Sequence, residues 1–140
     1  MTRMKLIPKN RYEIFRKRAK QYHTSMEDAY EKGNYDACTG NAVHCAISAV
    51  DAFTVMKLGR KSSAQNHNEI ILLLKEARTS DETEKARVGE KLYELLSMKS
   101  IAEYDDRELS RGDADRARTL CEKIHSFLEK EMELTKEGVS

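Results

Sequence analysis

The sequence predicts an all-α protein, an up-and-down antiparallel bundle of four long helices plus one short helix. Apolar residues recur at steps of three and four along most of the chain, which is the period of an amphipathic helix. No segment rich in Val, Ile and Thr alternates between apolar and polar positions, as a half-buried strand would. The 140 residues suit one domain, and 35% of them are charged, which is typical of helices with solvated outer faces.

The first helix is predicted over residues 9–32. Asn10 is its candidate N-cap, because a glutamate follows three residues later. Gly33 is expected to end it, since glycine readily adopts the left-handed conformation at a helix C-terminus. One apolar stripe runs along this helix, so we expect it to pack along its whole length: Tyr12, Phe15, Ala19, Tyr22, Met26 and Ala29.

The second helix is predicted over residues 35–58 and is closed by Gly59. We place it at the centre of the bundle, because small residues on its inner face let neighbouring helices approach closely. These small residues are Cys38, Ala42, Cys45, Ala46, Ala49 and Ala52. The three cysteines of the chain are interpreted as small buried hydrophobes, since their number is odd and no Cys-x-x-Cys occurs.

Three more helices complete the predicted bundle. They run from His67 or Asn68 to about residue 77, from a cap region at 79–81 to about 103, and from a capping-box-like start at Ser110 and Asp113 to about 133. We therefore expect one domain over residues 9–134, between a flexible basic segment (1–8) and a frayed C-terminal end (135–140).

Composition excludes several classes of protein. No apolar run approaches the roughly 18 residues of a membrane span, and no secretory signal is recognisable, so a cytoplasmic location without a membrane partner is expected. The histidines lack metal-ligand spacing and no glycine-rich phosphate loop occurs, so we expect neither a metal nor a cofactor. His44, among Ala and Val residues, is interpreted as a core or interface histidine.

Positive charge is concentrated at the start of the chain. The net charge is +1, yet the first twenty residues hold eight Lys or Arg against the single acid Glu13. This segment is either a solvated face or an attachment surface for nucleic acid or an acidic partner.

Two polar connectors carry the residues from which a binding or catalytic site could be built. Arg60 and His67 flank the connector before the third helix, where Arg would hold a phosphate and His would move a proton; ordinary helix capping is the alternative. Lys99, Tyr104 and Asp105 stand where the fourth helix ends, and the alternative there is a tyrosine packed at the end of the bundle beside solvated acids.

Around these connectors the sequence resembles the HEPN domain family, over roughly residues 12–130. The segments that carry the resemblance are 41–53, 60–67, 70–74, 98–106, 113–117 and 124–127. The resemblance implies a helical bundle that is commonly a homodimer. The resemblance also implies a function. Many members of the family are RNA-cleaving toxins of toxin–antitoxin modules, and they are often encoded beside a small MNT-type nucleotidyltransferase. Other members are binding modules.

The resemblance also indicates which activity to expect. Active members carry Arg, four to six residues, then His, whereas here Lys99 and Tyr104 occupy those positions. Lys binds phosphate without the bidentate fork of Arg, and Tyr is a poor base because its pKa is near ~10. We therefore expect a binding module for a nucleotide, RNA or a nucleotidyltransferase, with Arg60, His67, Lys99, Tyr104 and Asp105 as ligand-binding residues. The alternative is a metal-independent ribonuclease toxin with His67 and Arg60 as catalytic residues.

Overall fold

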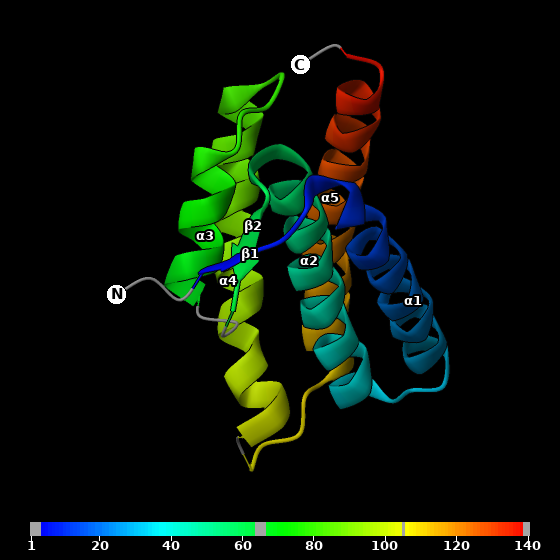
Figure 1. The fold of residues 1–140 in the computed structure, drawn as a ribbon. Coiled ribbons are helices and arrows are strands. Elements are labelled where there is room, and N and C mark those ends of the chain that lie inside the picture. The colour runs from blue at the N-terminus through cyan, green and yellow to red at the C-terminus, as the bar shows by residue number, and fades with distance from the viewer. Residues whose placement is uncertain (1–3, 64–66, 105, 139–140) are drawn as a thin grey trace.

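The prediction of an all-α protein is confirmed by a computed structural model, which describes residues 4–63, 67–104 and 106–138, and of residues 4, 5, 103 and 104 the backbone only. Figure 1 shows the bundle. Its helices are α1 (Tyr12–Glu31), α2 (Tyr35–Leu58), α3 (His67–Glu76), α4 (Glu82–Tyr104) and α5 (Arg111–Lys136). Their bounds lie within a few residues of those that the apolar periodicity predicted.

Helix α2 forms the centre of the bundle, as predicted. It contacts α1, α3, α4 and α5, which surround it in Figure 1. Every residue from Cys45 to Val55 is buried, and a helix buried on all sides belongs to the interior of a protein. All three cysteines are buried and free, as predicted. Within the part of the chain described, no helix is long and apolar enough to span a membrane.

The start of α1 differs from the prediction. Residues Lys9–Arg11 form a 3-10 helix, η1, so Asn10 lies inside this turn and is not the N-cap of α1. Arg11 occupies that position and makes no side-chain cap hydrogen bond. The backbone supplies a bond instead, because the amide of Arg11 donates to the carbonyl oxygen of Pro8 at 2.9 Å. The prediction that Ser110 and Asp113 form a capping box at the start of α5 is confirmed.

A short antiparallel ribbon, which the sequence pattern did not predict, joins the first residues to the connector after α2. Strand β1 (Met4–Leu6) pairs with β2 (Arg60–Ser62), with Lys5 opposite Lys61. Gly59 makes the turn into β2 at a φ of 69°, and its carbonyl oxygen accepts a hydrogen bond from the amide of Ile7 at 2.8 Å. A Cβ at Gly59 would lie 3.3 Å from the Ile7 carbonyl oxygen, so the close approach also favours glycine.

Candidate functional site

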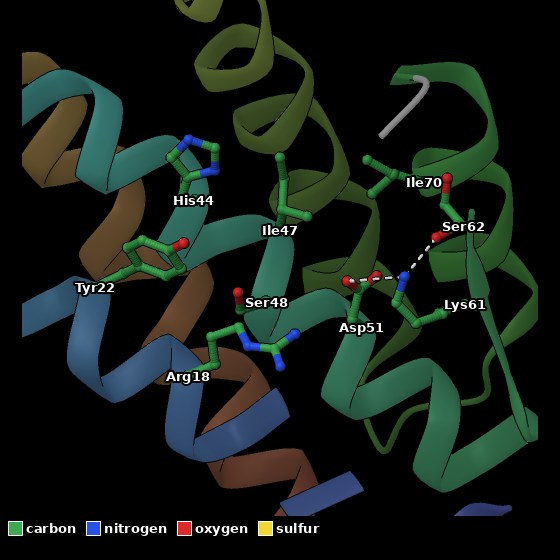
Figure 2. Close-up of a pocket in the computed structure, with 9 residues that line it drawn as sticks. All are labelled: Arg18, Tyr22, His44, Ile47, Ser48, Asp51, Lys61, Ser62 and Ile70. Carbon is green, nitrogen blue, oxygen red and sulfur yellow. Dashed lines mark hydrogen bonds and ion pairs between the residues drawn. The ribbon is translucent and has the colours of Figure 1, made fainter. Parts of the chain in front are cut away.

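A pocket of about 260 Å³ lies where α1, α2, β2 and α3 meet (Figure 2). Helix α2 supplies its floor, because His44, Ser48 and Asp51 follow one another at steps of four and three and therefore share one helix face. The remaining lining residues come from α1, α2, β2 and α3: Arg18, Tyr22, Ile47, Lys61, Ser62 and Ile70. Figure 2 shows Tyr22 and His44 at one end of the pocket and Asp51 and Lys61 at the other.

Asp51 is the charged residue of the pocket floor. Its exposed fraction is 8%, and burial raises its pKa to about 7, although Lys61 and Arg18 act to lower that pKa. The Lys61 Nζ lies 3.9 Å from Asp51 Oδ2, which makes an ion pair but is too long for a hydrogen bond. Within the described residues, no group donates a hydrogen bond to this carboxylate. Asp51 is therefore an acceptor that faces the pocket with its bonding capacity unused.

Two cations border the pocket beside Asp51. Lys61 donates from Nζ to the carbonyl oxygen of Ser62 at 2.8 Å, which fixes the end of its side chain. The guanidinium of Arg18 lies over the ring of Phe15, 5.3 Å from the ring centroid, and Lys61 Nζ lies 5.8 Å from the same centroid. One aromatic ring thus orients both cations by cation–π attraction.

At the opposite end, the rings of Tyr22 and His44 stack with their centroids 5.2 Å apart. Both residues are partly exposed, so aromatic surface is available to a ligand there. The buried side chains of Ile47 and Ile70 add apolar surface to the same pocket. The pocket therefore combines cations for an anionic group, apolar and aromatic walls for a planar group, and a deep carboxylate that accepts hydrogen bonds.

The residues predicted from the first connector are not brought together. Arg60 forms an ion pair with Glu76, the last residue of α3, whereas His67 is the first residue of that helix. Nine residues of helical rise separate His67 from Glu76, which is about 13 Å. Arg60 and His67 therefore lie near opposite ends of α3.

His67 instead lies within electrostatic reach of Lys99 on α4. Burial lowers the pKa of His67, and the positive charge of Lys99 lowers it further. The structure thus brings together one residue from each predicted connector. Tyr104 is the last residue of α4, placed here by its backbone, and Asp105 lies outside the described residues.

The family model of the HEPN domain matches residues 12–131 of the chain. The chain belongs to the HEPN family. This agrees with the resemblance of residues 12–130 in the sequence, and it places the chain among helical modules related to nucleotides and RNA. No curated protein matches the chain.

The HEPN domain has a basic surface on α1 that adjoins the pocket. A groove of about 660 Å³ runs along this surface and is lined by residues 13, 14, 16–18, 20 and 21. Lys17, Arg18 and Lys20 are exposed there. Arg16 is engaged in the fold, because it donates to the Glu129 carboxylate of α5 at 2.8–3.1 Å. Arg18 lines both the groove and the pocket, so the two surfaces are continuous.

Sequence reasoning about this HEPN domain missed most of the pocket. In the sequence, Tyr22 belongs to the apolar stripe of the first helix and Lys61 to a polar connector, and neither position indicates a pocket. The available signal was Asp51, which is the one charged residue in the otherwise uncharged run from Cys45 to Val55. A carboxylate in a buried helix is costly unless it has a partner or a role, so it marks a place to examine.

Proposed function

We propose that this HEPN domain is a binding module that holds a nucleotide or single-stranded RNA at the pocket between α1, α2, β2 and α3. The observation that carries the proposal is the combination of Arg18, Lys61 and Asp51 in one pocket that opens onto a basic helix face. Arg and Lys side chains bind phosphate oxygens, and Asp and Ser side chains bond to base or ribose groups.

Single-stranded RNA suits this arrangement better than a duplex. Proteins recognise RNA sequence mainly on unstacked bases, which pack on aromatic side chains and expose their hydrogen-bonding edges. Tyr22 and His44 offer such aromatic surface within the pocket. The exposed cations Lys17 and Lys20 would contact the sugar-phosphate backbone on either side of the bound unit.

The proposal includes a homodimer that pairs with a small MNT-type nucleotidyltransferase, as a toxin–antitoxin-like couple. Support for a protein interface comes from Tyr93 on α4, which is 58% exposed and lines a groove together with Ile71 and Leu74 of α3. Large exposed apolar side chains gathered on one surface are typical of interaction faces. Light scattering of the isolated protein would give the mass of the assembly. Copurification with a nucleotidyltransferase encoded beside it would test the pair.

RNA binding is tested by fluorescence anisotropy with a labelled mixed-sequence RNA 12-mer at 50 mM and 200 mM KCl. We expect binding that weakens with salt, because phosphate contacts release counterions. Arg18→Gln should weaken binding several-fold. Arg87→Gln, which removes the same charge from an exposed site on α4, should not. Absence of binding to the 12-mer and to mononucleotides at 50 mM KCl would refute the proposal, as would equal effects of the two variants.

A second candidate function is a metal-independent ribonuclease, which one observation favours. Burial and the charge of Lys99 lower the pKa of His67, which favours the neutral imidazole, the form that can accept a proton. Lys99, which lies within electrostatic reach of His67, would stabilise the developing phosphorane, whereas Arg60 is paired with Glu76 near the other end of α3. Cleavage of RNA in the presence of EDTA, abolished by His67→Ala, would support this function. Intact RNA after prolonged incubation with the unsubstituted protein would exclude it.

A further inference from the structure

The pocket has room for one nucleobase-sized unit. Its volume of about 260 Å³ lies just below the usual ~300–1,000 Å³ of sites for drug-sized ligands. Ile47 and Ile70 supply apolar surface for the faces of a planar ring, and Tyr22 supplies an aromatic surface. The chain of a longer ligand must therefore leave the pocket, and Arg18 lies where the pocket meets the basic groove of α1.

The hydrogen-bonding character of the pocket is set by Asp51. This carboxylate is buried, and no described residue donates a hydrogen bond to it. Lys61, its ion-pair partner at 3.9 Å, donates to the Ser62 carbonyl oxygen instead. Ser62 in turn donates from Oγ to Glu69 of α3 at 3.2 Å. Above pH 7, a ligand that enters the pocket thus meets a mainly ionised acceptor, and its neighbours Lys61 and Ser62 already donate to other groups.

Nucleobases differ in what they can offer to such an acceptor. Cytosine carries an exocyclic amino group at ring position 4, where uracil carries a carbonyl oxygen, and Asp side chains accept hydrogen bonds from the cytosine amino group. Adenine and guanine also carry amino groups. A carbonyl oxygen placed against an ionised carboxylate is repelled, and the carboxylate remains unsatisfied.

We infer that the pocket selects a single unstacked nucleobase that bears an exocyclic amino group, with Asp51 accepting a hydrogen bond from that group. The inference rests on the proposed function, since it assumes that RNA or a nucleotide occupies the pocket. Asp51 acts here as a specificity residue. Arg18 and the neighbouring lysines of α1 bind the backbone without regard to sequence.

The purely structural explanation is that Asp51 and Lys61 only hold β2 against α2. The substitution Asp51→Asn would preserve the shape of the side chain while adding an amide that donates to a carbonyl oxygen. A structural role predicts a change of stability with no change of base preference. A specificity role predicts that the preference moves towards uracil.

The test measures the affinity of the full chain at pH 8 for labelled oligo(rC) and oligo(rU) of equal length. Three proteins are compared: the unsubstituted protein, Asp51→Asn, and the charge-matched control Asp28→Asn on the exposed face of α1. We expect oligo(rC) to bind about tenfold more tightly than oligo(rU) to the unsubstituted protein and to Asp28→Asn. In Asp51→Asn, this preference should disappear or reverse.

Equal affinity of the unsubstituted protein for the two oligomers would overturn the inference and leave the proposed function standing. A preference that persists in folded Asp51→Asn would overturn it as well. Binding of neither oligomer would remove the proposed function itself.

A second readout needs no substitution. Among the described residues, the charged or titratable groups around Asp51 are Arg18 and Tyr22 from α1, Lys61 from β2, Glu69 of α3 behind Ser62, and His44 farther along α2. Protonated Asp51 gains an O–H that can donate to the uracil carbonyl oxygen, while it loses part of its capacity to accept, so the rC preference of the unsubstituted protein should fall between pH 8 and pH 6. A preference that is constant over this range would contradict the inference.

Discussion

Replacing Asp51 by Asn should stabilise the protein at alkaline pH and leave its stability at acidic pH nearly unchanged. The carboxylate is buried in the centre of the bundle, where its charged form lacks hydrogen bonds from the described residues. Asparagine has nearly the same shape and carries no charge. The substitution therefore removes the cost of burying the charge while it retains most of the packing.

The magnitude follows from the pKa of Asp51, which burial raises from an ordinary 3.8 to about 7. Because the pKa is higher in the folded state, the folded protein binds the proton more tightly than the unfolded chain does. The associated stability is present below pH 3.8 and is lost as the pH rises through about 7. One pKa unit corresponds to ~1.4 kcal/mol, so full ionisation of Asp51 lowers the free energy of unfolding by about 4 kcal/mol. Between pH 4.5 and pH 8 the loss is about 3 kcal/mol.

The assay is urea denaturation of the unsubstituted protein and Asp51→Asn at pH 4.5, 6 and 8. From pH 4.5 to pH 8, the free energy of unfolding of Asp51→Asn should rise by about 3 kcal/mol relative to that of the unsubstituted protein, at constant m-value. Asp28→Asn, on the exposed face of α1, controls for the loss of one negative charge. A difference between Asp51→Asn and the unsubstituted protein that is the same at all three pH values would refute the reasoning.

Three further predictions concern other parts of the molecule. Ser110→Ala removes the capping box of α5 and should lower the free energy of unfolding by ~1 kcal/mol, seen as a melting temperature lower by about 4 °C; an unchanged melting temperature would contradict it. Glu131→Ala leaves the amide and hydroxyl of Ser80 without their acceptor, so it should lower the free energy of unfolding by about 2 to 3 kcal/mol in urea denaturation. Ser80→Ala should show part of this effect, and a loss below about 0.5 kcal/mol in Glu131→Ala would show that these bonds contribute little. Lys99→Ala should raise the pKa of His67, followed by NMR titration of the imidazole, because the positive charge of Lys99 disfavours the imidazolium; an unmoved titration curve would show that burial alone lowers it.

The helices could be predicted because their signals are local. Each long helix repeats an apolar pattern over several turns, and Gly33, Gly59 and Ser110 punctuate the chain where helices end or begin. The N-cap at Asn10 was wrong because one glutamate at the right spacing does not distinguish an α-helix from a preceding 3-10 turn. The ribbon of β1 and β2 escaped prediction because three residues are too few to display alternation.

The candidate site was harder to predict. Arg60 and His67 are separated by six residues in sequence, which suggested one site, yet they lie near the two ends of α3. His67 and Lys99 come from different connectors and lie within electrostatic reach of each other. Spacing in sequence reports proximity only within one regular element, whereas these residues belong to separate elements whose mutual placement depends on packing.

The sequence by itself determined the class of the fold, the central position of α2 and the family. These properties depend on periodicity, residue size and a pattern spread over most of the chain, all of which are readable in one dimension. Only the tertiary structure decided that Arg18, Asp51 and Lys61 border one pocket. Lys61 comes to Asp51 because β1 pairs with β2 and α3 packs beside that ribbon, so the pocket exists only once these distant segments have packed against α2.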